Sequence, residues 1–202
     1  MHQNSWLLFE KYALPIFNEG CSVLEIGPDG KPSTYQKLVG SRSGDWDTVE
    51  ISNSQLNTTY LATTLYEYPI EDNRYDIVLS GQVIEHVPNL WRWMKEISRI
   101  CKPGGTVITI NPVTWFYHEA PVDCWRIYPE GMKALSEDAG LEVIVSTWES
   151  VEIDRLARWL PESVRQRKVR LQRFALVFDL IGRALRSNFR GSFDTITLAR
   201  KL

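Results

Sequence analysis

A short apolar run that ends in a glycine- and proline-containing loop is the feature of this chain that most constrains its fold. Residues 23–30 are Val-Leu-Glu-Ile-Gly-Pro-Asp-Gly. The aliphatic residues of Cys21–Ile26 predict a buried parallel strand. Gly27 and Gly30 allow a sharp turn close to a ligand, because neither carries a Cβ atom. Such a loop before a helix is where α/β folds hold nucleotide-like cofactors, although the same residue types also form ordinary turns.

Glu50 strengthens the nucleotide-binding interpretation. It lies in a second β-like run, Trp46–Ile51. Nucleotide-binding α/β folds place an acid about 20 residues after the glycine loop, where it binds two ribose hydroxyls. A carboxylate can accept hydrogen bonds from both hydroxyls at once. The alternative interpretation is a charged residue at a strand end.

Further segments continue the alternation of strands and helices. Tyr75–Ser80 predicts a buried strand, and the segment Gly81–Val87 follows it. Leu90–Cys101 has apolar residues at helical spacing. Lys102–Gly105 contains the proline and glycines that end a helix. Thr106–Ile110 predicts the next strand.

Together these segments resemble class I S-adenosylmethionine-dependent methyltransferases. The matching parts are the LEIGP loop, Glu50, the YDIVLSGQVIEHV segment and the KPGG turn, in the family's order over residues 21–111. His118–Gly131 resembles a subgroup with the pattern H-x-x-P-x-D-x-W-R, often linked to glycan or natural-product modification. The resemblance implies S-adenosyl-L-methionine as cofactor. It also implies an α/β fold with a Rossmann-like seven-stranded, mostly parallel sheet, helices on both faces and an antiparallel last strand.

The resemblance also implies a cofactor site at the ends of the strands. Its expected members are Glu25, Gly27, Pro28, Gly30, Glu50, Ile51, Thr64, Leu65, Ser80, Gly81 and Gln82. The loop departs from the family's usual three-glycine form, so its geometry stays open, and Asp29 is either a contact or a turn residue. Thr64 stands where many relatives carry an acid for adenine, so we expect backbone groups and Leu65 to hold the base.

The acceptor side is expected around the EHV segment and the residues after the fifth strand. His118 is a candidate general base, since an unperturbed imidazole titrates near neutral pH, and Asp123 would orient it or bind a substrate hydroxyl. His86 is either a further catalytic residue or a histidine that fixes its loop. The expected substrate-binding residues are Glu85, Trp125 and Arg126. A core position is the favoured alternative for Trp125, and a salt bridge is the alternative for Arg126.

Composition narrows the class of protein. The 202 residues suffice for one domain with a large core. A net charge of −2 gives no bias toward nucleic acid. Three cysteines without regular spacing predict a reduced, cytoplasmic setting and no cysteine-only metal site. The sequence shows neither a signal peptide nor an apolar membrane span, and it shows no evident metal cluster, although Asp123 and Glu85 could hold an ion.

The predicted organisation is a single methyltransferase domain over residues 1–202. It comprises an N-terminal helix within 1–20, a cofactor-binding core over 21–150, a basic helical insertion over 151–190 and a final strand within 191–202. Strands are expected near 21–26, 46–51, 58–62, 75–80, 106–110, 141–148 and 191–199. Helices are expected near 5–17, 33–39, 90–101 and 129–139.

Residues 155–190 differ from the rest in charge. They carry ten arginines and lysines against two acids. One interpretation is an amphipathic helix that associates weakly with an anionic membrane or a lipid-linked substrate. The favoured interpretation is a helical insertion that packs over the substrate face or a second subunit, so a homodimer is also open.

The expected function is methyl transfer from S-adenosylmethionine to a small-molecule or glycan acceptor, preferably at a hydroxyl oxygen, with no nucleic-acid partner. The sequence does not distinguish a sugar hydroxyl from a phenol, a carboxylate or an amine. One rival is a non-catalytic partner protein of the same fold, against which the glycine loop, Glu50 and His118 argue. The other is a nicotinamide-dependent oxidoreductase, against which the EHV and KPGG segments and the incomplete G-x-G-x-x-G argue.

Overall fold

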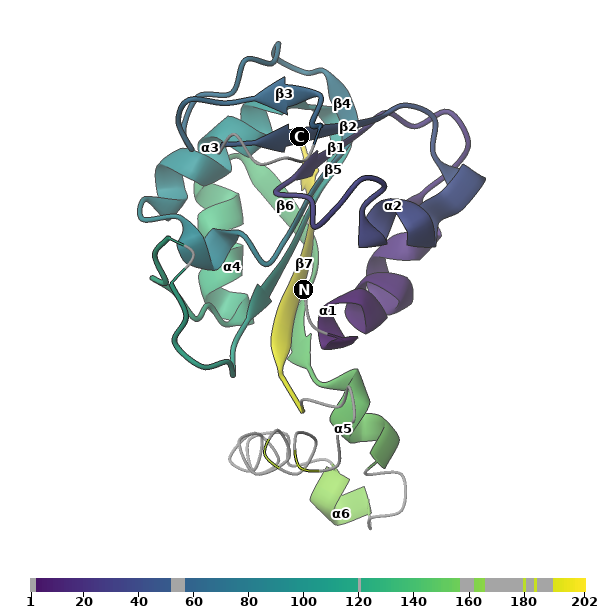
Figure 1. The fold of residues 1–202 in the computed structure, drawn as a ribbon, viewed down its shortest axis with the longest axis vertical. Coiled ribbons are helices and arrows are strands. Elements are labelled where there is room, and N and C mark those ends of the chain that lie inside the picture. Colours follow the sequence, from purple (N-terminus) through teal and green to yellow (C-terminus); the bar gives the residue numbers. More distant parts are fainter. Residues whose placement is uncertain are drawn as a thin grey trace.

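The computed structural model describes residues 3–51, 57–119, 121–156, 162–165, 180, 184 and 191–202. Its centre is a seven-stranded sheet in the order β3-β2-β1-β4-β5-β7-β6 (Figure 1). The strands are β1 (Val23–Ile26), β2 (Trp46–Glu50), β3 (Tyr60–Leu61), β4 (Tyr75–Gly81), β5 (Cys101–Pro112), β6 (Leu141–Glu149) and β7 (Asp194–Lys201). Strand β7 runs antiparallel to both of its neighbours, β5 and β6, whereas the other described strand pairs are parallel. The predicted Rossmann-like fold is therefore confirmed.

The strand order reverses between β1 and β4. The chain moves outward from β1 through β2 to β3, and then returns to β4 on the other side of β1. At this point Ile26 of β1 pairs with Ser80 of β4, and both strands end within one residue of the pair. In open α/β sheets ligands bind beyond the carboxyl ends of the strands where the order reverses. The glycine loop and the segment after β4 therefore meet at the position where a ligand is expected.

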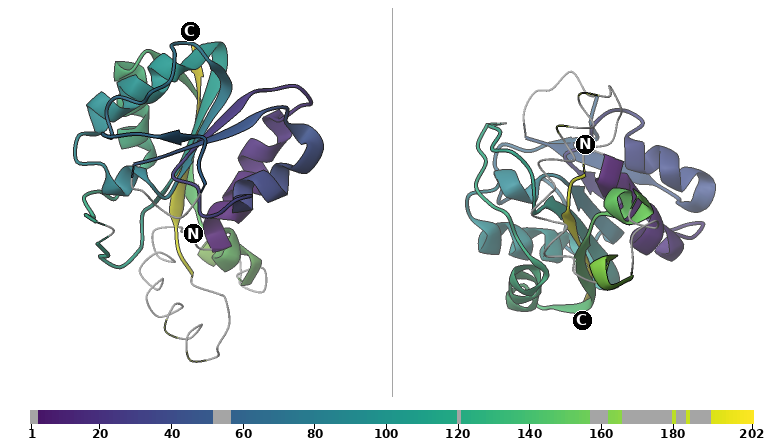
Figure 2. Two further views of the ribbon diagram at one scale, coloured as in Figure 1. Left: turned by 45° about the horizontal axis from the view of Figure 1, so that its top comes forward. Right: turned by 90° about the horizontal axis from the view of Figure 1, so that it is seen from below.

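Helices cover both faces of the sheet, as Figure 1 and Figure 2 show. On one face lie α3 (Leu90–Ile100) and α4 (Pro129–Asp138), and on the other lie α1 (Gln3–Leu8) and α2 (Thr34–Val39). Each pair packs on its own buried apolar cluster. The segment after β6 forms the short helices α5 (Val151–Leu156) and α6 (Glu162–Arg165).

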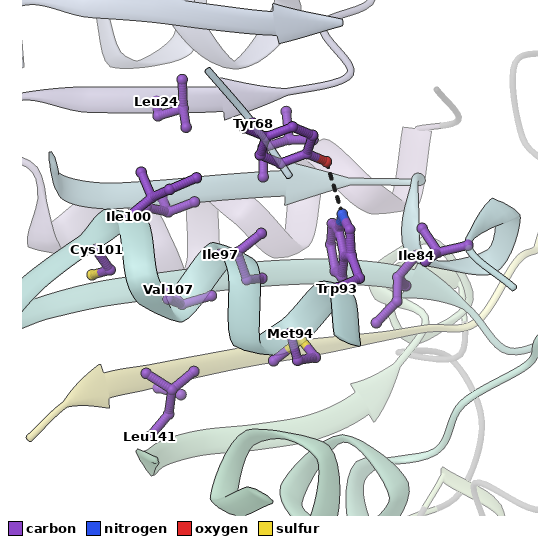
Figure 3. Close-up of a cluster of buried hydrophobic side chains, with 14 of the residues drawn as sticks. Leu24, Tyr68, Ile84, Trp93, Met94, Ile97, Ile100, Cys101, Val107 and Leu141 are labelled. Atoms are coloured by element: carbon purple, nitrogen blue, oxygen red, sulfur yellow. Dashed lines mark hydrogen bonds between the residues drawn. The ribbon is translucent and has the colours of Figure 1, made fainter. Parts of the chain in front are cut away.

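The apolar face of α3 shows why the periodic pattern predicted a helix. Its buried apolar residues recur at helical spacing, and they are Leu90, Trp93, Met94, Ile97 and Ile100. The helix begins after Asn89, whose side chain accepts a hydrogen bond from the Arg92 amide. Within this cluster the Trp93 indole donates to the Tyr68 hydroxyl at 2.9 Å (Figure 3). That bond satisfies two polar atoms that the core would otherwise bury unpaired.

Two predicted boundaries are wrong. The strand predicted over Thr106–Ile110 begins earlier, at Cys101 immediately after α3, so the KPGG segment lies inside β5. The register shifts between Tyr75 and Ile77 to accommodate these extra residues, and Gly104 takes a φ of +77°. The predicted helix 5–17 consists of three segments: α1, a π-helical turn over Phe9–Ala13 and a 3-10 turn over Leu14–Ile16.

Most of the predicted basic insertion lies outside the described residues. Within 155–190 the structure describes the end of α5, α6 and two single positions. The proposed membrane, substrate or subunit contacts of this segment therefore stay predictions. None of the helices that the structure describes is both long and apolar enough to span a membrane.

Candidate functional site

Gly27 occupies a position that only glycine fits. Its φ is +67°, and a Cβ atom added there would lie 2.6 Å from Cγ2 of Val83. The Gly27 amide donates to the carbonyl of Val49 at 3.0 Å. The loop after β1 is therefore drawn toward the end of β2, where Glu50 follows. This close backbone approach fits a loop that wraps a ligand.

Glu25, predicted to contact the cofactor, is buried beneath this loop. Its side chain accepts hydrogen bonds from the Ser33 hydroxyl and from the Trp46 indole, the latter at 3.0 Å. Ser33 in turn caps α2 by accepting from the Gln36 amide at 3.0 Å. Burial raises the pKa of Glu25 to about 7. The carboxyl group thus ties β1 to β2 and to the start of α2.

Asp29 has the structural role that its turn-residue interpretation predicted. Its two oxygens accept from the amide and the hydroxyl of Thr34, at 2.8 and 2.7 Å. It therefore holds the glycine loop against the first turn of α2. Pro28 is buried beside it, and Gly30 is partly exposed.

Glu50 and Ile51 lie at the end of β2, where sequence reasoning expected the ribose. Oε1 of Glu50 accepts from the Ile51 amide at 2.8 Å, and the residue is partly buried. Thr64 and Leu65 follow β3: the Thr64 hydroxyl accepts from the Tyr66 amide at 3.3 Å, and Leu65 packs against the α3-side core. The residues expected at the ribose and those expected at the adenine therefore lie on the same side of β1, after β2 and after β3.

The end of β4 holds buried hydroxyl groups. A Cβ atom at Gly81 would collide with the hydroxyl of Tyr35, so this glycine is required by packing. Among the described residues, the hydroxyls of Tyr35 and Ser80 are buried and have no hydrogen-bond partner. Burial also raises the pKa of Tyr35, which keeps its phenol protonated. Polar atoms of this kind beside a tight glycine turn fit a polar ligand, since buried unpaired groups are costly.

Gln82 connects the end of β4 to two distant parts of the chain. It adopts a left-handed φ of +60°, which is strained for a residue with a side chain. Its amide nitrogen Nε2 donates to the Ser5 hydroxyl at 2.9 Å and to Oδ1 of Asp194 at 3.3 Å. Asn4 of α1 donates to the other oxygen of Asp194 at 2.6 Å. Sequence reasoning missed these partners, because residues so far apart in the chain give no local signal.

The loop between β5 and α4 is fixed by an ion pair. Arg126 donates to both oxygens of Asp123, at 2.5 and 2.7 Å, and to the Phe116 carbonyl at 3.1 Å. The Arg126 guanidinium holds the pKa of Asp123 at about 2. Arg126 therefore forms the salt bridge considered for it, while its role toward a substrate stays a prediction. Trp125 is partly buried against the core, and its indole donates to the Val87 carbonyl at 2.9 Å.

This loop forms an open hollow of about 300 Å³. It is lined by aromatic and charged side chains together with one cysteine: Trp115, Tyr117, Asp123, Cys124, Trp125 and Arg126. Both aromatic faces and hydrogen-bonding groups are thus available to a small ligand. The Cys124 amide donates to the Glu85 carbonyl at 2.7 Å, which holds the loop against the segment after β4.

The structure brings His86 and His118 together. Their ring centroids are 5.0 Å apart, edge to face. The His118 amide donates to Oδ2 of Asp123 at 2.8 Å, and Nδ1 of its ring lies 3.3 Å from the same oxygen. Nε2 of His86 lies 3.8 Å from Oε1 of the buried Glu85. Asp123 therefore contacts both the backbone and the ring of His118, and His86 lies beside it. The catalytic roles of these residues stay predictions.

Three side chains with metal-ligand atoms lie close together where the sequence showed no evident cluster. One ligand atom each from Glu85, His86 and His118 lies within 4.8 Å of the others. Glu85 and His86 are adjacent in sequence, whereas His118 lies in the loop that follows the carboxyl end of β5. Only the parallel pairing of β4 and β5 places the three together.

Comparisons with known proteins agree with this fold. Residues 40–109 match the family model of a methyltransferase domain. A curated relative, the mitochondrial ubiquinone biosynthesis O-methyltransferase of Dictyostelium discoideum, is 42% identical over 114 residues, which are 52% of this chain and 35% of that protein. The chain spans between 20% and 38% of the length of the first curated relatives it matches.

Solved structures share the fold over nearly the whole chain. A SAM-dependent methyltransferase from Methanosarcina mazei superposes with a TM-score of 0.60 at 12% identity, covering 96% of this chain and 97% of that one. Phosphoethanolamine N-methyltransferase 2 of Haemonchus contortus, in complex with S-adenosyl-L-methionine, gives 0.58 at 15% identity, covering 98% and 52%. These likenesses show the methyltransferase fold. With the domain match, they support S-adenosylmethionine as the cofactor, while the H-x-x-P-x-D-x-W-R subgroup stays a prediction.

Proposed function

We propose that this protein transfers a methyl group from S-adenosylmethionine to a hydroxyl oxygen of a small-molecule or glycan acceptor. The observation that carries the proposal is the meeting of two parts at one edge of the sheet. The glycine turn with Glu50 beside it suits the cofactor. The His86–His118 pair suits an acceptor, and Asp123 links it to the aromatic-lined hollow. The O-methyltransferase of Dictyostelium among the relatives supports oxygen as the methylated atom.

The reaction is an in-line displacement at the methyl carbon. The acceptor oxygen forms the new bond to carbon, the carbon–sulfur bond breaks, and its electron pair stays on sulfur as S-adenosylhomocysteine. Sulfonium is already a good leaving group, so the protein acts mainly by alignment. Positioning of this kind supplies ~7–11 kcal/mol in well-oriented reactions.

The acceptor proton has to leave during the transfer, and we assign its removal to the site around His118. The ring is 38% exposed, so an acceptor can reach it, while Asp123 and the Phe116 carbonyl orient its Nδ1 side. Acid–base assistance of this kind contributes ~10²–10⁴-fold. Arg126 acts indirectly, because it holds Asp123 in place.

Label transfer from methyl-labelled S-adenosylmethionine tests the proposal. The acceptor panel contains a phenol, a sugar, a carboxylic acid and an amine, and the products are resolved by mass spectrometry. We expect label on the hydroxyl acceptors and an equal yield of S-adenosylhomocysteine. Label on the amine or the acid alone would contradict an oxygen acceptor of the hydroxyl class, and binding of a nicotinamide dinucleotide without S-adenosylhomocysteine binding would contradict the proposed function itself.

A further inference from the structure

We propose that Glu85, His86 and His118 bind a divalent transition-metal ion of the zinc type, and that this ion holds the acceptor oxygen. The role toward the acceptor rests on the proposed function, whereas ion binding itself does not. Two imidazoles and one carboxylate form a ligand set of catalytic zinc sites, which keep a further position open. Magnesium prefers oxygen ligands, so the two histidines favour a transition metal.

The spacing of the three side chains suits one shared ion. Ligand atoms about 2.1 Å from zinc lie roughly 3.4 Å apart in a tetrahedral site. Oε1 of Glu85 and Nε2 of His86 are 3.8 Å apart, already close to that value. No pair in the cluster exceeds 4.8 Å, so a closure of at most roughly 1.4 Å completes a tetrahedral set. His118 is partly exposed and can supply this movement by rotation of its side chain.

The backbone contacts of both histidines select the ring nitrogen that binds metal. Nδ1 of His86 lies 2.5 Å from the Val122 carbonyl, and Nδ1 of His118 lies 3.1 Å from the Phe116 carbonyl. A carbonyl only accepts, so in the neutral ring each Nδ1 carries the proton and each Nε2 keeps its lone pair. Metal-bound histidines almost always donate their other N–H to a carbonyl or a carboxylate in this way.

In this tautomer Nε2 of His86 and Oε1 of Glu85 are both acceptors, and they lie 3.8 Å apart. Two acceptors at this distance can share one cation, and buried carboxylates are found as metal ligands.

A metal ion here would change how the acceptor proton leaves. An oxygen bound to zinc loses its proton near neutral pH, whereas the same group in water keeps it. The acceptor hydroxyl would bind the open position, release its proton to water and attack the methyl carbon as the oxyanion. His118 would then serve as a ligand rather than as a free base. Asp123, which contacts His118, also lines the hollow beside Trp115, so an acceptor in this hollow would lie near the proposed ion.

Cobalt(II) binding to the chelator-treated protein tests the site without an activity assay. Cobalt replaces zinc and absorbs visible light when bound by nitrogen and oxygen ligands. We expect one equivalent to bind, to be displaced by zinc, and to bind at least ~100-fold more weakly in His118→Ala and Glu85→Gln, since even outer-shell changes cost 10–100-fold. The matched control is His2→Ala, which removes the remaining histidine of the chain. Circular dichroism confirms that each variant folds.

Three results would overturn the metal site: no cobalt binding by the wild type, wild-type binding by folded His118→Ala, or loss of binding in His2→Ala. Calorimetry with S-adenosylhomocysteine on the same chelator-treated sample separates the two proposals. Cofactor binding without cobalt binding refutes the metal site and leaves the proposed function standing. Cobalt binding without cofactor binding refutes the proposed function and leaves the metal site standing.

Discussion

Glu25→Gln should make the protein more stable at alkaline pH. Burial raises the pKa of the folded-state carboxyl from 4.5 to about 7. The native state therefore binds more protons than the unfolded state between these values, and stability falls as pH rises through this window. The stabilisation is present in full below pH 4.5. The shift of 7 − 4.5 = 2.5 units corresponds to about 3 kcal/mol at ~1.4 kcal/mol per unit.

Glutamine keeps the acceptor that the structure uses, because Ser33 and Trp46 both donate to the same oxygen of Glu25. Urea unfolding followed by tryptophan fluorescence at pH 5, 6, 7 and 8 measures the effect. We expect the free energy of unfolding of the wild type to fall by up to about 3 kcal/mol more than that of Glu25→Gln over this range. Glu71→Gln, which changes an exposed acid, should follow the wild type. Parallel pH profiles for wild type and Glu25→Gln would refute the reasoning.

Three further predictions concern the loops and the basic segment. Gly27→Ala should weaken S-adenosylhomocysteine binding at least ~10-fold in calorimetry, because the new methyl group has no room in a strained turn. Gly140→Ala is the control: its φ is also positive but the space around it is open, so cofactor affinity should not change. Equal losses of affinity in both variants would contradict this prediction. Asp123→Asn should lower the rate of methyl transfer by ~10-fold or more and leave cofactor affinity unchanged, since loss of the carboxylate loosens the loop that carries His118. Full activity of this variant would remove Asp123 from the site. Liposome flotation should show no salt-sensitive binding to anionic vesicles, because we expect the basic insertion to pack on protein. Strong flotation that is lost when three arginines are changed to serine would instead favour membrane binding. These arginines are Arg165, Arg167 and Arg170.

The fold was largely predictable because its signals are local. Most strands carry their own aliphatic run, and the apolar residues of α3, which are buried in the structure, recur at helical spacing. The KPGG segment shows the limit of such signals. Its proline and glycines correctly mark the end of α3, but they do not reveal that a bulged strand begins at once.

The positions of the candidate site residues in the fold were more predictable than their contacts. Gly27 and Glu50 lie where motif spacing placed them, at neighbouring strand ends. Glu25 has partners inside the chain, and Gly81 is required by the packing of Tyr35, which no local pattern could show. The cluster of His118 with His86 depends on the pairing of two strands, so it emerged only from the tertiary structure.

Calorimetric titration with S-adenosylhomocysteine and, separately, with NAD tests the central claim most directly. We predict one binding site for S-adenosylhomocysteine and none for NAD. In Glu50→Ala we predict affinity weaker by roughly 1.5–3 kcal/mol, the range for hydrogen bonds to a charged group, while Glu71→Ala matches the wild type. Binding of NAD without S-adenosylhomocysteine, or unchanged affinity in a folded Glu50→Ala variant, would contradict the account.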